Sequence, residues 1–208
     1  MTNTKIHVNI LISSIETTKR NKKGEKMSPD LSLNITMSIL LLDRSMSMAK
    51  FGDKPISAVN THLNTMRKLQ EEIEFYCGVL FFAKKTKPMT KILPVGLLPN
   101  IKSEDCPLES GSYLFESVND TIKNLIDHWD APKESAPQIM IGVFSDGEDN
   151  STNKHQQHEL HQTAKIAIAN GWDLLSFGFG IEGSELAERL GFPTDPDHAI
   201  TIPKIWCV

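Results

Sequence analysis

Short apolar runs without polar alternation are the feature that most restricts the fold of this chain. Residues 39–42 and 139–144 contain no polar side chain, and segments with apolar residues at every third or fourth position separate such runs. A strand has this composition when helices cover both faces of its sheet, and strands that alternate with helical segments form mostly parallel sheets. The pattern therefore predicts an α/β domain of three layers, with a central sheet between two layers of helices.

The positions of the expected elements follow from the same periodicity. Apolar steps of three and four residues mark helices, whereas short apolar or alternating runs mark strands. We expect strands at 35–42, 75–82, 91–97, 138–144, 173–179 and 199–202, and helices at 55–72, from Ser112 to the residue before Pro132, at 154–170 and at 184–190. This order is typical of a Rossmann-like sandwich in which the strands 35–42 and 138–144 lie in the middle of the sheet.

Length and local composition indicate one domain with an N-terminal extension. A chain of 208 residues is long enough for one well-packed domain, which we assign to residues 34–208. Residues 1–33 form the extension. Within it, apolar residues alternate over 6–12 as in an extra half-buried strand, and residues 18–26 are basic and polar as in an exposed loop.

Composition excludes several classes of protein. The net charge of −4, with acidic and basic residues interspersed, gives no basic surface for nucleic acid. The three cysteines lie far apart without a CxxC pair, which argues against a disulfide framework or zinc knuckle and favours a reducing compartment. No run approaches the roughly 18 apolar residues of a membrane span. We therefore expect a soluble, cytoplasmic protein that binds neither nucleic acid nor membrane.

Oxygen-bearing side chains follow both expected central strands and open one helix. Asp43, Ser45 and Ser47 come directly after the first central strand. Ser112 opens the second helix, and Asp146 follows the other central strand. Because the ends of parallel strands and the starts of the following helices share one edge of the sheet, these residues are expected to meet there. Hydroxyls and carboxylates without Cys or His suit a hard cation, Mg²⁺ or Mn²⁺. We expect the hydroxyls to ligate the ion directly and the carboxylates to act through water.

These segments resemble the metal site of the von Willebrand factor type A domain, also called the integrin I-domain fold. The run DRSMS at 43–47 matches the family's DxSxS signature, Ser112 falls where the family usually has Thr, and Asp146 matches the Asp of its TDG motif. The order and spacing agree over residues 34–203. The resemblance implies a metal-ion-dependent adhesion site that holds Mg²⁺ or Mn²⁺ and leaves one coordination position for an Asp or Glu of a partner protein.

Two details refine this resemblance. Residues 52–60 look like the segment that follows DxSxS in bacterial stand-alone members associated with tellurium resistance. Ser112 and Ser145 stand where the family usually has Thr, and serine lacks the methyl group that stiffens χ1. We therefore expect the Ser112 contact to survive with weaker preorganisation.

Each segment also has a purely structural interpretation. Asp and Ser favour polar turns, so the runs 43–47 and 145–147 are each compatible with a turn, and Ser112 is compatible with a helix N-cap. Residues 148–150 are interpreted as structural. The three histidines His155, His158 and His161 are interpreted as part of a solvated helix face. The occurrence of all three segments in order favours the metal site.

The expected function is non-enzymatic, Mg²⁺-dependent binding of a protein partner. The motifs GxxxxGK[ST], GxGxxG and GxSxG are absent, so a phosphate cradle is not indicated and no small-molecule substrate is expected. A metal-dependent phosphohydrolase or phosphotransferase is the main alternative, because an Asp at a strand end beside Mg²⁺ can act as a nucleophile. Such enzymes generally need a second acid two residues after the nucleophile. That position is Ser45, whose hydroxyl cannot act as an acid and base near neutrality, so the sequence argues against this alternative. The third alternative is a scaffold with a vestigial metal site.

Overall fold

The fold is a twisted sheet between two layers of helices. The computed structural model describes residues 35–70, 73–88, 90–128, 137–150 and 155–203. The strands run in the order β3-β2-β1-β5-β6-β7, and β4 pairs with β2. They are β1 (Ile35–Asp43), β2 (Glu74–Phe82), β3 (Thr86–Pro88), β4 (Leu93–Pro94), β5 (Gln138–Ser145), β6 (Asp173–Phe179) and β7 (Ala199–Ile202). Only β3 and β4 pair antiparallel in the described part of the sheet.

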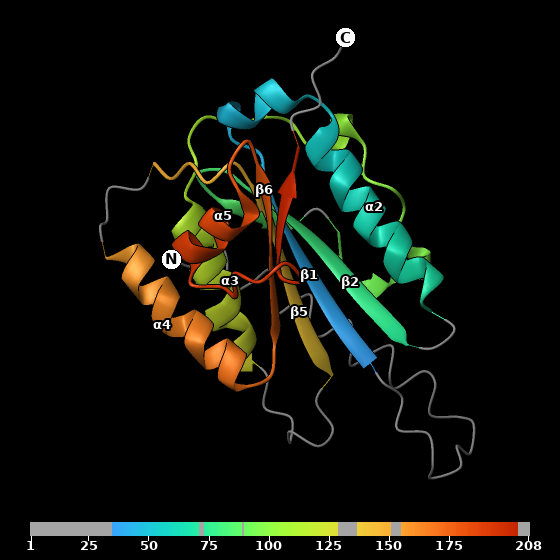
Figure 1. Ribbon diagram of the computed structural model, residues 1–208. Helices are drawn as coiled ribbons and strands as arrows, with labels where there is room; N and C mark the ends of the chain where they lie inside the picture. Colours follow the sequence, from blue (N-terminus) through green and yellow to red (C-terminus); the bar gives the residue numbers. More distant parts are fainter. Residues whose placement is uncertain (1–34, 71–72, 89, 129–136, 151–154, 204–208) are drawn as a thin grey trace, which may run out of the picture.

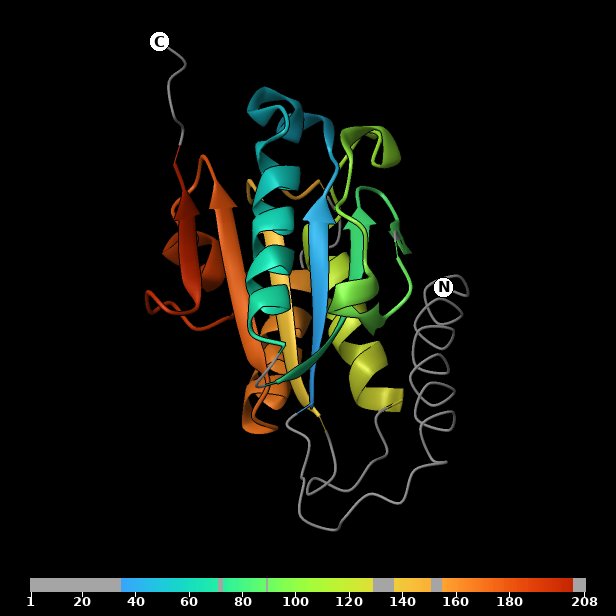
Figure 2. The ribbon, with the colours of Figure 1, turned by 90° about the vertical axis from the view of Figure 1, so that its right-hand side faces the viewer.

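Helices cover both faces of the sheet, as predicted. Helix α2 packs on one face, and α3, α4 and α5 pack on the other (Figure 1, Figure 2). The helices are α2 (Lys54–Lys68), α3 (Leu114–His128), α4 (Gln156–Ala169) and α5 (Gly183–Leu190), with 3₁₀ turns η1 (Met46–Phe51), η2 (Val95–Leu97) and η3 (Ser103–Asp105). None of the helices in these ranges is long and apolar enough to cross a membrane.

The two central strands divide their side chains between the two layers. Leu40 and Leu42 of β1 pack with α2, whereas Ile39 and Leu41 pack with α3 and α4. All four are 2% exposed or less. Because alternate side chains of a strand point to opposite faces, a strand covered on both sides carries apolar residues on both faces, in nearly continuous runs. This requirement explains the runs that predicted the fold, and the prediction that β1 and β5 lie mid-sheet is confirmed.

Helix α2 buries the apolar stripe that its periodicity predicts. Ile56, Val59, Leu63 and Met66 are all buried against the sheet. The helix ends at Lys68, four residues before the predicted end at 72. The Leu69 N–H lies within hydrogen-bonding distance of two carbonyls, those of Thr65 and Met66, so the last turn tightens before the chain turns towards β2.

Three details of the predicted elements are wrong. The strand predicted at 91–97 is reduced to the two residues of β4 followed by η2, because Pro94 cannot extend a sheet ladder. The short antiparallel strand β3 was not predicted. The apolar spacing over 154–170 predicts that Ile168 is buried with Leu160, Ala164 and Ala167, but Ile168 is 41% exposed and α4 packs through the other three.

Most of the remaining predictions about elements agree with the structure, and those for the N-terminal extension are not tested by it. The other strand predictions agree with the structure to within one residue at each end, and α5 starts one residue early. Cys77 is buried in β2, where burial raises the pKa of its thiol to about 12. The N-terminal extension at 1–33, with its expected strand and basic loop, lies outside the described residues.

Candidate metal centre

The three predicted segments meet at the carboxyl edge of the sheet. Strands β1 and β5 are adjacent and parallel, so Asp43 at the end of one lies next to Ser145 at the end of the other. The loop before α3 reaches the same edge, because the Glu109 N–H donates to the Arg44 carbonyl at 2.8 Å. Ser112 follows three residues later. Residues that are 69 and 102 positions apart in sequence are therefore brought into direct contact.

Asp43 is the centre of the cluster. Its side chain is fully buried and accepts hydrogen bonds on both oxygens. The Ser45 N–H donates to Oδ1 at 2.9 Å. Ser145 Oγ and Ser112 Oγ donate to Oδ2 at 2.7 Å and 3.4 Å. Three segments of the chain are thus fixed to one carboxylate.

Burial raises the pKa of Asp43 to about 6. Desolvation is the largest cause, and it outweighs the lowering effect of the hydrogen bonds from Ser45 and Ser145. The nearby charge of Asp146 raises the pKa further. A negative charge in this position is therefore poorly compensated by the protein alone, and a bound cation would compensate it.

The other half of the cluster joins the serines of the first segment to Asp146. Ser45 Oγ and Ser47 Oγ are hydrogen-bonded at 2.9 Å, and Ser47 Oγ donates to Asp146 Oδ1 at 3.2 Å. The Glu148 N–H also donates to Oδ1, at 3.3 Å. Oδ2 of Asp146 is buried and accepts no hydrogen bond from the described residues. Among the described residues, the one charged group close to Oδ2 is Lys50 Nζ, at 3.0 Å. The two form an ion pair without the alignment of a hydrogen bond.

Residues after Asp146 hold the loop that carries Ser112. The Ser112 N–H donates to Asn150 Oδ1 at 2.9 Å, and the Asn150 N–H donates to the Ser112 carbonyl at 2.7 Å. Asp149 Oδ1 accepts from the Phe115 N–H at 3.4 Å, within the first turn of α3. The structural interpretation of Asp149 and Asn150 is thereby confirmed. Sequence reasoning did not predict the reciprocal Asn150–Ser112 link, nor the role of Ser145 as a donor to Asp43.

Ser112 is not the N-cap of α3. The helix begins two residues later, at Leu114. The Ser112 hydroxyl lies towards Asp43 instead, and its side chain is completely buried. The structure therefore excludes the N-cap interpretation of Ser112 and leaves its oxygen within the cluster.

The donor set fits a hard cation. The cluster consists of hydroxyl and carboxylate oxygens, which magnesium prefers, and contains no Cys or His. No group of three or more His, Cys, Asp and Glu side chains gathers as metal ligands within the described ranges, so a zinc-type site is not indicated there. His158 of the predicted histidine face is exposed, and His161 Nε2 is 2.9 Å from the Arg189 carbonyl.

Comparisons with known proteins identify the fold. No protein-family model and no curated protein sequence matches the chain. Among solved structures, the SpRpn10 VWA domain is 14% identical with a TM-score of 0.51, over 82% of this chain and 88% of that domain. The chain has the von Willebrand factor type A fold. This fold is the framework that brings the DxSxS run, Ser112 and Asp146 to one edge.

Two further solved structures are similar to this chain over most of its length. The pilus adhesin SpaC from Lactobacillus rhamnosus GG, in its open conformation, is 11% identical with a TM-score of 0.59, over 84% of this chain and 28% of SpaC. Proximal thread matrix protein 1 from the mussel byssus is 12% identical with a TM-score of 0.50, over 82% of this chain and 42% of that protein. The chain thus spans less than half the length of these two proteins.

Proposed function

We propose that the protein is a non-enzymatic binding module that recognises a protein partner through a Mg²⁺ ion, or a Mn²⁺ ion, held at this cluster. Ser45, Ser47 and Ser112 would ligate the ion through their hydroxyls. Asp43 and Asp146 would accept hydrogen bonds from its water ligands and supply negative charge. The ion supplies a Lewis-acidic coordination position, which an Asp or Glu of the partner would complete.

One observation carries the proposal: all five predicted site residues form a single hydrogen-bonded cluster of oxygen atoms. Asp43 lies within hydrogen-bonding distance of Ser112, and Asp146 of Ser47. The buried Oδ2 of Asp146 retains unused accepting capacity. Lys50 Nζ forms only an ion pair with this oxygen, without hydrogen-bond alignment. A buried acceptor that lacks a hydrogen bond costs free energy, which a bound ion and its waters would recover. The fold alone assigns no function, because one fold hosts many.

The arrangement gives less support to a phosphohydrolase or phosphotransferase. A nucleophilic carboxylate needs an exposed oxygen, whereas Asp43 is fully buried and both its oxygens accept hydrogen bonds. The position that would carry a second acid is Ser45, whose hydroxyl cannot serve as an acid and base near neutrality. Binding is therefore preferred over turnover.

The metal site can be tested by thermal unfolding. Millimolar Mg²⁺ or Mn²⁺ should raise the melting temperature relative to EDTA, because an ion that binds only the native state stabilises it by mass action. Ser45→Ala and Ser47→Ala should reduce the shift strongly, whereas Ser57→Ala, at an exposed position of α2, should not. Absence of a shift in the wild-type protein would favour a scaffold with a vestigial site.

The binding role needs a second experiment with a partner. Proteins captured in Mg²⁺ but released by EDTA should also be lost with Ser45→Ala. Replacing one Asp or Glu of a captured partner by Asn or Gln should abolish the interaction. Metal-dependent hydrolysis of generic phosphoesters that disappears with Asp43→Asn would instead establish the enzymatic alternative.

Location and subgroup belong to the same proposal. We place the protein in the cytoplasm, in line with Cys77 and Cys106, which are buried free thiols in the described structure. The assignment to bacterial stand-alone members associated with tellurium resistance is supported by the resemblance of residues 52–60 alone.

A further inference from the structure

A cation of the chain itself lies against the candidate metal site. Lys50 Nζ is 3.0 Å from Oδ2 of Asp146 and 3.9 Å from Oε1 of Glu148. The Asp146 side chain is 2% exposed, whereas the side chains of Lys50 and Glu148 are 51% and 55% exposed. The ammonium group therefore lies between one buried carboxylate and one exposed carboxylate.

The position of Lys50 follows from the segment that carries the serines. The turn η1 starts immediately after Ser45 and contains Lys50 near its end. Phe51 is buried beneath it, and Lys50 Nζ lies 5.1 Å from the centre of the Phe51 ring, within range of a cation–π contact. The ammonium is thus tethered beside the Asp146 carboxylate through the segment that supplies two of the hydroxyl oxygens.

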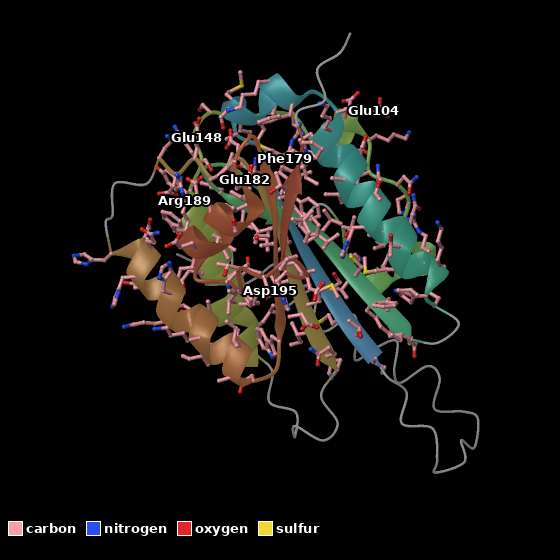
Figure 3. All side chains as sticks on the ribbon, in the orientation of Figure 1. Glu104, Glu148, Phe179, Glu182, Arg189 and Asp195 are labelled. Carbon is pink, nitrogen blue, oxygen red and sulfur yellow. The ribbon has the colours of Figure 1, made fainter. Side chains whose placement is uncertain are left out.

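We propose that Lys50 is a built-in competitor of the divalent ion. In the metal-free protein its ammonium compensates the charge of Asp146. Metal binding requires that it leave Asp146 and pair with Glu148, whose carboxylate lies at the same edge beside η1 (Figure 3). This inference rests on the proposed metal site, and it adds that the affinity for metal is set by exchange between two cations.

The physical reason is that two positive charges compete for one buried carboxylate. Oδ1 of Asp146 accepts hydrogen bonds from Ser47 and from the Glu148 N–H, whereas Oδ2 accepts none from the described residues and has the Lys50 ion pair as its compensating contact there. A divalent ion among the neighbouring hydroxyls would repel the ammonium at short range. Glu148 gives the displaced ammonium a second partner, which limits the cost of exchange. The exposed position of Lys50 keeps its hold on Asp146 modest.

Calorimetric titration with Mg²⁺ and with Mn²⁺ tests the competition. Lys50→Gln should lower the dissociation constant by about three- to tenfold, a range that reflects the partly exposed ion pair. Lys165→Gln, which removes an equal charge from an exposed position of α4, should leave it unchanged. Equal or weaker binding by Lys50→Gln would overturn the competition while leaving the proposed metal site intact.

Substitution of Glu148 provides a second, independent test of the exchange. Glu148→Gln should weaken metal binding in the wild-type background, because the displaced ammonium loses its alternative partner. In the Lys50→Gln background the same change should have a clearly smaller effect. Equal effects in both backgrounds would show that Glu148 acts on the metal directly and would contradict the exchange.

Unfolding in EDTA provides a readout without metal. Lys50→Gln should lower the melting temperature when Asp146 is present and should have a clearly smaller effect in the Asp146→Asn background, where only the contacts of Lys50 with Glu148 and Phe51 are lost. If neither the wild-type protein nor any variant binds metal, the proposed function and the competition both fail. The double-mutant cycle of Lys50 and Asp146 in EDTA still measures their ion pair. If only Lys50→Gln binds metal, the competition is supported and the wild-type protein is shown to be self-inhibited.

Discussion

At the scale of single residues, Ser145 donates the shortest of the hydrogen bonds that reach the Asp43 carboxylate. Its hydroxyl donates to Asp43 Oδ2 at 2.7 Å, whereas Ser112 Oγ is 3.4 Å away from the same atom. Ser145 Oγ also accepts from the Gly147 N–H at 3.0 Å. One hydroxyl therefore joins the end of β5, the end of β1 and the turn that carries Asp146.

Ser145→Ala is expected to destabilise the metal-free protein by about 1–3 kcal/mol, because it leaves a buried carboxylate oxygen with one long hydrogen bond and a buried N–H with none. Urea unfolding in EDTA measures the difference. Ser184→Ala, at an exposed position in α5, should change stability by less than about 0.5 kcal/mol. Equal small effects of both substitutions would show that Asp43 does not need the Ser145 donor.

The meeting of the candidate site residues at one edge of the sheet could be predicted from the sequence, but most of their pairings could not. Asp43 and Asp146 follow apolar runs whose burial fixes where the strands end, so their shared edge follows from strand order. The Asn150–Ser112 link joins residues 38 apart in two loops. Loop conformation depends on local turns, which have no hydrophobic period in the sequence. The hydrogen-bond partner of a polar side chain in a loop therefore cannot be predicted from the spacing of residues.

At the scale of elements, α2 packs on the sheet through a histidine as well as through its apolar stripe. The His62 ring lies edge-on to Phe144 of β5 and Phe177 of β6, with ring centroids 6.4 Å and 5.7 Å apart. Those two phenylalanine rings are stacked at 4.1 Å. Nε2 of His62 is buried and has no hydrogen-bond partner among the described residues. Protonation would place a charge in this aromatic contact.

Burial accordingly lowers the pKa of His62 below its ordinary value of 6.5. The unfolded chain then binds more protons than the folded protein as the pH falls through that value, so His62 makes the protein less stable in mild acid. We expect the free energy of unfolding to decrease less between about pH 7 and pH 5.5 in His62→Phe than in the wild-type protein.

Urea unfolding across that range, in EDTA, measures this difference between the two proteins. His158→Gln removes an exposed histidine from α4 and should leave the wild-type pH dependence unchanged. A His62→Phe protein with the same pH dependence as the wild type would show that the ring is protonated without cost.

The central strands and the edge strand β7 were predicted from the sequence, whereas β3 was not predicted and β4 was predicted too long. Strands β1 and β5 are covered on both faces, so each contains a long apolar run that is visible in the sequence. By contrast, β3 and β4 have three and two residues and pair only with β2, and each contains a proline. Such short edge strands depend on their neighbour for register, and a pattern of two or three residues has no measurable period.

At the scale of the whole molecule, the parallel register of β1 and β5 fixes the distance between loops that are distant in sequence. Leu42 is paired with Phe144, so the residues that follow both strands emerge side by side. Since the central strands are packed on both faces, they provide a rigid base for the cluster. The loops beyond them are held by backbone hydrogen bonds and by hydrogen bonds from backbone N–H groups to side chains.

Metal binding should therefore slow hydrogen exchange in three separate loops at once. Backbone N–H groups of Ser45, Ser112, Gly147 and Glu148 all donate to side chains of the cluster or of Asn150. An ion ligated by Ser45, Ser47 and Ser112 would hold these three loops together and lower the frequency of local opening at each of them.

Exchange measured by mass spectrometry with Mg²⁺ and with EDTA should show added protection in peptides that cover 43–47, 110–115 and 145–150. The middle of β1 and β5 should exchange slowly in both conditions, because a core strand opens only with much larger parts of the fold. Ser45→Ala should remove the added protection from all three loops together. Protection confined to one loop would mean that the ion binds there alone and that the cluster does not act as one site.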